Sequence, residues 1–262
     1  MEKHEGDYGV VIPGLGAEYH FTDRLSALAG VHRGFVPVAP SADAGVDPES
    51  SINYEAGGRW RDAYVSADLI GFLSDYSNLK GSCTLAAGCT EVQEGMEFNG
   101  GAVFTYGLEA QVGAELPLHK RSKLVMPINA AYTLTRSSFQ HDFSSEFAGW
   151  GEVEKGDELP YLPHHQLSIA AGLKLPKYEV GATARYQGET RDVAGQGAIP
   201  DAERLAPLFT IDLSAHARLH DYAELYATCS NVLDEQVIIS RRPYGARPNA
   251  PRMFAFGYKA RF

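Results

Sequence analysis

Four arginines crowd into the last long connection and the start of the last expected strand: Arg241, Arg242, Arg247 and Arg252. No Asp or Glu follows Glu235, although the whole chain carries a formal net charge of −10. Guanidinium groups pair bidentately with carboxylates and phosphates, and they keep their charge at every physiological pH. The cluster therefore predicts a local cationic site for an anion that presents carboxylate groups.

Other residues could extend this site into a basic vestibule: Tyr244, Arg185 on the wet face of a predicted strand, Arg191 at the outer end of that strand and Arg33 near another outer strand end. Two other roles stay open for the same side chains. Basic residues at the outer ends of membrane strands bind lipopolysaccharide phosphates or pair with loop acids. Pro243, Pro248 and Pro251 also suggest a segment whose main task is to fix a loop.

Other chemistry has little support. We find no Gly-x-Ser-x-Gly, no His-Glu-x-x-His and no phosphate-cradling glycine loop, so we expect neither an enzyme nor a bound cofactor. An enzyme whose Ser and His come from separate strands stays an alternative, which esterase activity would reveal. The adjacent His164 and His165 cannot both face one metal from a regular strand, and we expect no metal site. The negative net charge argues against a general nucleic-acid binder.

The three cysteines suggest an oxidising compartment. Cys83 and Cys89 bracket Thr-Leu-Ala-Ala-Gly in a stretch with Gly, Ser and Asn, which predicts a small loop closed by a disulfide. Metal binding is the weaker alternative, because two thiols without a nearby His or second pair do not complete a zinc site. Cys229 is interpreted as a small hydrophobe on an apolar strand face.

Alternating segments must position these groups. In 254–262, 209–219 and 178–187, apolar residues alternate with polar, basic or small ones. Successive side chains of a strand point to opposite faces, so one face suits lipid and the other a wet interior. A soluble sheet can alternate in the same way. No apolar run approaches the ~18 residues of a spanning helix, which excludes a helical membrane protein.

The whole chain predicts an all-β fold, an antiparallel transmembrane β-barrel with about eleven strands. The strands are expected near 10–21, 24–35, 51–61, 63–76, 101–115, 123–135, 165–175, 178–190, 208–219, 222–232 and 250–262. Short connections alternate with long ones, as periplasmic turns alternate with extracellular loops in outer-membrane barrels. This assigns the C-terminus to the periplasm.

The odd strand count predicts an incomplete barrel. Closing eleven strands alone would need a parallel seam, which single-chain bacterial barrels avoid. Counting back from a periplasmic C-terminus also places the first strand's start outside the cell. Residues 1–6 lack the features of a signal peptide. We therefore expect a fragment.

Several stretches resemble the C-terminal half of TonB-dependent outer-membrane receptors. They are Tyr19–Phe35, Ser51–Gly57, Glu158–Gln166, Asn231–Glu235 and the terminal aromatic strand. The segment Ser240–Arg252 is similar to that of the ferric-citrate-type branch of the family.

The resemblance implies a barrel of about 22 strands around a plug domain, with residues 1–262 as a partial barrel domain and the plug absent. It implies uptake of a ferric chelate, such as ferric citrate or a carboxylate siderophore, energised by the TonB complex through the missing plug. Outer-membrane lipids and the barrel-assembly machinery are the other implied partners, and Phe262 looks like the assembly signal. The alternative is a passive or structural outer-membrane barrel fragment without autonomous transport.

Overall fold

The computed structural model describes residues 9–38, 47–82, 97–144, 151–241 and 245–260, and their regular structure is entirely β. The main sheet has eleven strands: β1 (Gly14–His20), β2 (Leu25–Val36), β3 (Glu49–Arg61), β4 (Val65–Asn78), β7 (Val103–His119), β8 (Leu124–Phe139), β11 (His165–Lys174), β12 (Tyr178–Gln187), β15 (Leu208–His220), β16 (Ala223–Ser230) and β19 (Met253–Ala260). Within these ranges no helix has the length and apolar character needed to cross a membrane.

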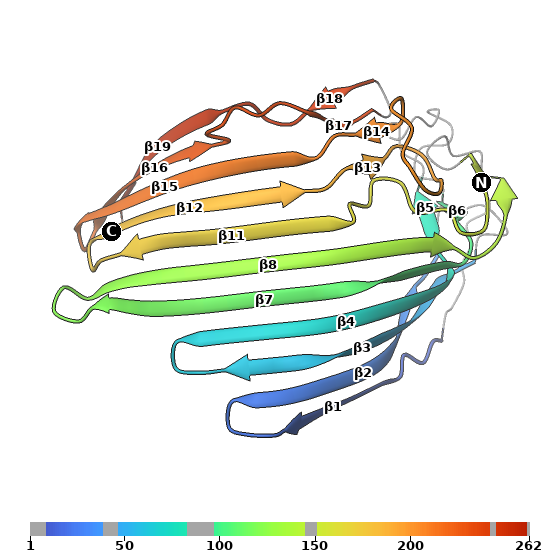
Figure 1. Ribbon diagram of the computed structural model, residues 1–262, viewed down its shortest axis with the longest axis horizontal. Helices are drawn as coiled ribbons and strands as arrows, with labels where there is room; N and C mark the ends of the chain where they lie inside the picture. The colour runs from blue at the N-terminus through green and yellow to red at the C-terminus, as the bar shows by residue number, and fades with distance from the viewer. Residues whose placement is uncertain (1–8, 39–46, 83–96, 145–150, 242–244, 261–262) are drawn as a thin grey trace.

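The sheet is a simple meander. Each main strand pairs antiparallel with the next one along the chain, from β1 at one edge to β19 at the other. Short turns join the strands at one end of the sheet, and long connections join them at the opposite end (Figure 1). The predicted all-β class, the antiparallel pairing and the number of strands are confirmed.

Two central strands are longer than the sequence predicted. We expected strands at 101–115 and 123–135, whereas β7 continues to His119 and β8 to Phe139. Their ladder extends past Pro117, which faces Val125, and at the other end it closes with Val103 opposite Phe139. A proline interrupts strand pairing where the partner strand would accept a hydrogen bond from the N–H that proline lacks. Here the pairing continues past Pro117, and the register between β7 and β8 shifts just beyond it.

The sheet stays open in the described residues. β1 pairs with β2 alone and β19 with β16 alone, so two strand edges remain without a partner. These eleven strands therefore form a curved wall and not a closed barrel. Whether a further set of strands completes a barrel of about 22 strands stays a prediction.

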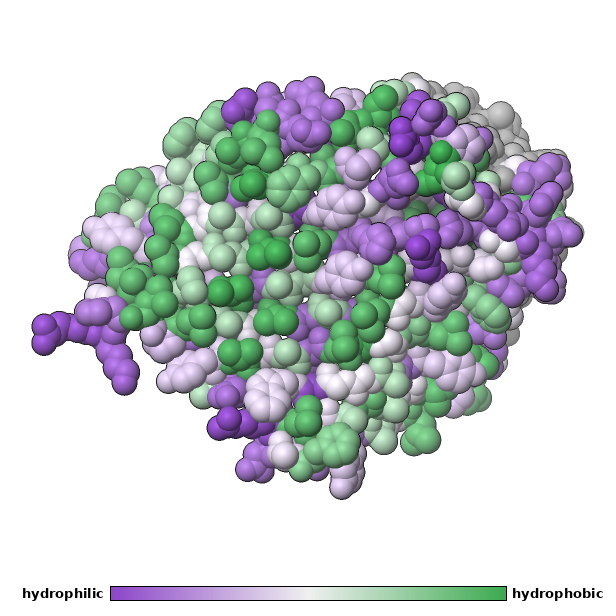
Figure 2. Space-filling model, in the orientation of Figure 1, coloured by the Kyte–Doolittle hydropathy of each residue, from purple (hydrophilic) through white to green (hydrophobic). Residues whose placement is uncertain are grey.

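Side chains alternate between two faces of the wall. Across β12 and β15, Ala184 faces Ile211, while the neighbouring Thr183 faces Asp212 on the opposite side. We call these the apolar face and the polar face. Large hydrophobic side chains remain exposed on the apolar face; Phe256, for example, is 79% exposed. Apolar residues spread over the middle of the sheet, and hydrophilic residues gather at the long connections (Figure 2). Such a surface suits hydrocarbon as its solvent.

Several charges on the polar face are paired across strands. Arg59 Nε donates to Asp68 Oδ1 at 3.0 Å, and Arg61 Nη2 lies 2.7 Å from Asp68 Oδ2. At the β1 edge, the Ser26 hydroxyl donates to Glu18 Oε1 at 2.6 Å. These contacts link β1 to β2 and β3 to β4 on the polar face.

The buried core lies at the end of the sheet that carries the long connections, which we call the loop end. Val103, Phe139 and Val153 are almost fully buried there, with Phe143 and Leu159 packed against them. Two-stranded ribbons build this region: β5 (Lys80–Ser82) with β6 (Glu97–Asn99), β9 (Phe143–Ser144) with β10 (Glu152–Val153), β13 (Thr190–Arg191) with β14 (Arg204–Leu205), and β17 (Ile238–Ser240) with β18 (Arg247–Pro248). The connection after β8 thus folds over the polar face.

Candidate functional site

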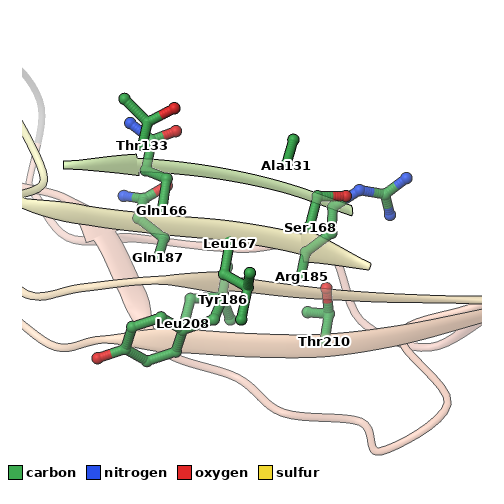
Figure 3. Close-up of a pocket in the computed structure, with 10 residues that line it drawn as sticks. All are labelled: Ala131, Thr133, Gln166, Leu167, Ser168, Arg185, Tyr186, Gln187, Leu208 and Thr210. Atoms are coloured by element: carbon green, nitrogen blue, oxygen red, sulfur yellow. The ribbon is translucent and has the colours of Figure 1, made fainter. Parts of the chain in front are cut away.

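A shallow groove of about 310 Å³ runs along the polar face near the loop end. Its polar lining comes from four adjacent strands: Thr133, Gln166, Ser168, Arg185, Gln187 and Thr210. Thr133, Gln166 and Gln187 point to one side of the sheet, and Tyr186 points to the other (Figure 3). Amide and hydroxyl groups of this kind can donate to and accept from a polar ligand, and a single cation stands among them.

That cation is Arg185, which the sequence placed on the wet face. Its guanidinium is ion-paired with the Asp212 carboxylate from the neighbouring strand. Asp212 also accepts a hydrogen bond from the backbone N–H of Asn231 at 2.8 Å. The Arg185 side chain is 55% exposed, so it can meet a ligand while it keeps this partner.

A carboxylate, Glu158, connects three elements at the loop end. Glu158 Oε1 lies 3.3 Å from Arg136 Nη1 of β8 and 3.0 Å from His164 Nε2, just before β11. Glu158 Oε2 lies 3.4 Å from Arg191 Nη2 of β13. The backbone of Glu158 also bridges to Gly195. We call the set Arg136, Glu158, His164 and Arg191 the Glu158 cluster.

Arg191 lies inside this cluster. Its side chain is only 4% exposed, and its Nη2 also donates to the Gly197 carbonyl at 3.0 Å. Its Nε is buried and has no hydrogen-bond partner among the described residues. The sequence predicted Arg191 at the outer end of a strand as part of a basic vestibule. The structure places it in β13 with its side chain buried, and direct ligand contact by Arg191 stays a prediction.

Tyr161 ties the β16–β19 connection to the same region. Its hydroxyl donates to the Asp192 carboxylate and accepts from the Arg241 backbone N–H at 3.4 Å. Burial is the main cause that raises the pKa of Tyr161, so the phenol stays protonated and acts as a donor. The connections after β8, β12 and β16 are thereby joined.

The arginines of the last connection have different surroundings. Arg241 Nη2 donates to the Arg204 carbonyl at 3.2 Å, and its Nε is buried. Arg247 is exposed on β18, where Nη2 donates to the Ser240 hydroxyl at 3.0 Å. Arg252 Nη2 pairs with Asp234 at 3.3 Å. The Arg252 backbone N–H, followed by its charge, lowers the pKa of Asp234, so for Arg252 pairing with a loop acid is the observed role.

Arg33 lies apart from these groups. It sits opposite Ile52 in β3, two residues after Val31, and therefore on the apolar face. Its Nε reaches the Ser50 hydroxyl at 3.4 Å. The structure does not bring Arg33 to the groove on the polar face.

Several predicted residues lie outside the described ranges: Arg242, Tyr244, Cys83, Cys89 and Phe262. Their predicted roles in ligand binding, in a disulfide and in assembly stay predictions. Cys229 is described as a free cysteine opposite Leu213 and Phe254, on the apolar face as expected.

Sequence reasoning missed the Glu158 cluster and the amide-rich lining of the groove. The two adjacent histidines have separate contacts: His164 contacts Glu158, whereas His165 Nδ1 lies 2.9 Å from the Tyr132 hydroxyl. The available signal was the pair of prolines around Tyr161, which marks a rigid connection before a strand.

The fold and the site together define a class. A meander with one exposed apolar face, a second face of paired charges, short turns at one end and interlocked loops at the other is the wall of an outer-membrane-type β-barrel. The model of the family "TonB dependent receptor-like, beta-barrel" matches residues 2–232, and the chain belongs to this family.

Solved structures agree on the fold. The chain is similar to the ferric-catecholate import receptor Fiu of E. coli K12, with 18% identity over 95% of this chain and 34% of that one, at a TM-score of 0.68. It is also similar to the ferripyoverdine receptor of Pseudomonas aeruginosa bound to ferripyoverdine, with 20% identity, coverage of 97% and 33%, and a TM-score of 0.69. It is similar as well to the ferric yersiniabactin uptake receptor FyuA of Yersinia pestis, with 17% identity over 95% of this chain and 37% of that one, at a TM-score of 0.68.

The chain spans about a third of the length of these receptors. No curated protein sequence matches it. Proteins of this family are outer-membrane receptors that transport ligands and do not catalyse reactions, which confirms the expectation that the chain is not an enzyme. No similarity singles out a ferric-citrate branch.

Proposed function

We infer that the chain forms the C-terminal part of the barrel wall of a receptor that takes up a ferric chelate. The chelate would present carboxylates, as ferric citrate and carboxylate siderophores do. The observation that carries this inference is a set of guanidinium groups: Arg185 lines the polar groove, while the half-buried Arg241 and the exposed Arg247 lie at the loop end. Bidentate pairing with carboxylates gives such groups both affinity and selectivity.

The architecture of the intact receptor follows from the same proposal. Another set of strands would complete a barrel of about 22 strands around a plug, and the TonB complex would act on that plug. The short turns and the C-terminus would face the periplasm, and the loop end the outside. The barrel-assembly machinery would recognise Phe262, and outer-membrane lipids would cover the apolar face.

Removal of the outer charges tests the ligand class. We expect the variant Arg241→Gln/Arg247→Gln to bind ferric citrate about tenfold more weakly for each lost contact, because a charge-assisted hydrogen bond contributes about 1.5–3 kcal/mol. The measurement is binding of radiolabelled ferric citrate to outer-membrane vesicles from cells that express the intact receptor in which this chain would form the C-terminal part of the wall. The wild-type affinity should fall with added salt.

The matched control is Lys177→Gln/Arg218→Gln, which also removes two positive charges, at the turn end of β12 and β15. Unchanged binding in this control with weakened binding in Arg241→Gln/Arg247→Gln would support a site at the loop end. Equal weakening in both would show only a general charge effect. Ion conductance through planar bilayers without any ligand preference would instead favour a passive barrel.

A further inference from the structure

A continuous chain of hydrogen bonds joins three connections at the loop end. Arg247 Nη2 of β18 donates to the hydroxyl of Ser240, its cross-strand partner in β17, at 3.0 Å. The Ser240 hydroxyl is hydrogen-bonded to the Tyr161 hydroxyl, which in turn donates to the Asp192 carboxylate. The chain thus leads from the β16–β19 connection through the β8–β11 connection into the β12–β15 connection.

The donors and acceptors of this chain allow a single direction. A guanidinium group can only donate, and a carboxylate can only accept. The Tyr161 proton therefore goes to Asp192. The Ser240 proton is then donated to the Tyr161 oxygen, and the Ser240 oxygen accepts from Arg247. Hydrogen bonds that run in one direction polarise one another, so each bond strengthens the next.

The two ends of the chain differ in exposure. Asp192 is buried, with 7% of its surface exposed, and its backbone N–H donates to Glu203 O at 2.9 Å. Arg247 is exposed on the last ribbon. The chain therefore ties an exposed cation to a buried anchor. A flexible arginine loses side-chain entropy when it binds a ligand, and an arginine that is already oriented loses less.

The backbone of Tyr161, in the middle of the chain, adopts an unusual conformation. Its φ is 58°, which is rare for a bulky residue, and it lies between Pro160 and Pro163. Its N–H donates to Arg191 O at 2.9 Å. Such a backbone conformation persists only where the surrounding structure imposes it. These constraints fix the Tyr161 hydroxyl at the junction of the three connections.

We propose that Tyr161 and Ser240 are positioning residues, which orient the Arg247 guanidinium for a ligand that carries carboxylates. This proposal rests on the function proposed above, and neither hydroxyl needs to contact the ligand. With one Nη nitrogen held by Ser240, the plane of the guanidinium is set, and its planar fork can match the two oxygens of a carboxylate. Loss of either hydroxyl keeps the charge of Arg247 and weakens its orientation.

Ferric citrate binding by the intact receptor tests the proposal in a double-mutant cycle. We expect Tyr161→Phe to weaken binding about fivefold, the effect of one lost hydrogen bond, and Ser240→Ala to do the same because it breaks the same chain. In an Arg247→Gln background, Tyr161→Phe should change the affinity by less than about twofold. Equal weakening in both backgrounds would show a general structural role and overturn the proposal.

The matched control is Tyr258→Phe in β19, which removes the hydroxyl of an exposed tyrosine opposite Leu225. This variant should bind ferric citrate as the wild type does. If it weakened binding as much as Tyr161→Phe, the effect would not come from the chain of hydrogen bonds, and the proposal would be wrong.

A measurement without ligand separates this proposal from the proposed function. Rotation of the Arg247 guanidinium, followed by nitrogen NMR in the intact receptor, should be about fivefold faster in Tyr161→Phe and in Ser240→Ala than in the wild type. The two variants break the chain at different points, so one remains informative if the other does not fold. Absence of ferric citrate binding in the wild type would refute the proposed ligand. Unchanged rotation in the folded variants would refute the positioning of Arg247, whatever the ligand.

Discussion

Asn231 shows how one side chain can organise a whole connection. It is buried and adopts a positive φ of 49°, a conformation that Asn tolerates better than most residues. Its side-chain amide donates to the Glu235 and Ala250 carbonyls at 2.9 and 3.0 Å, and its oxygen accepts from Glu235 N–H at 3.1 Å. Asn231 thereby joins the end of β16 to the residues that precede β19.

We expect Asn231→Ala to destabilise the protein by about 2–3 kcal/mol, because buried partners lose their hydrogen bonds and alanine disfavours the positive φ. Asn231→Gly should cost less, since glycine accepts the conformation. Urea unfolding in detergent measures both. Leu233→Ala, at an exposed position in the same loop, is the control and should change stability by at most about 0.5 kcal/mol. Equal losses in all three variants would contradict this role.

At the level of single residues, the sequence predicted some site groups and missed others. Arg185 could be placed because strand alternation alone decides its face. The prediction for Arg33 used its position along the strand and not its parity, which places it on the apolar face, and its role in ligand binding stays a prediction. The contacts of Glu158 and Arg191 depend on how two loops meet, and no periodicity encodes a meeting of that kind.

Among the strand elements, the pairing of β16 with β19 depends on a glycine, Gly257, which has no side chain. A Cβ on Gly257 of β19 would lie 2.0 Å from the Tyr226 ring of β16. Gly257 therefore lets this ring lie flat against the neighbouring strand, where it also stacks on His216 with centroids 6.2 Å apart. Aromatic residues often cover a strand glycine in this manner.

Gly257→Ala should displace the Tyr226 ring and destabilise the β16–β19 pair by about 1–3 kcal/mol. The measurement is a double-mutant cycle on unfolding free energies with Tyr226→Ala. Once Tyr226 has been truncated, the added methyl group should cost almost nothing. Additive losses would show that the ring and the glycine act independently.

The main strands were predictable and the ribbons were not. Eleven segments alternate over a length that can cross a membrane, and that signal repeats along the chain. The ribbons β9–β10, β13–β14 and β17–β18 contain two or three residues per strand. Segments so short carry no periodic pattern, and their pairing is decided by the side chains packed beneath them.

For the whole molecule, stability in a membrane should depend on the two sheet edges, β1 and β19, which have no strand partner among the described residues. Backbone groups of β1 and β19 without a strand partner would cost several kcal/mol each in hydrocarbon. We expect that residues 1–262 alone do not persist as a monomeric sheet in a bilayer. Light scattering and heat-modifiable gel migration of the purified chain check this. A monomeric, heat-resistant and fully β-structured chain would refute it.

The wall and the loop end should tolerate substitutions differently, and the buried cluster of Val103, Phe139 and Val153 marks the loop end. Along the wall, a substitution is tolerated when it matches the solvent on its side, because few neighbours constrain its shape. At the loop end, side chains fit one another as they do inside a soluble domain. Recognition of a new ligand should therefore arise most readily on exposed ribbon tips such as β18, while the residues that support them stay fixed.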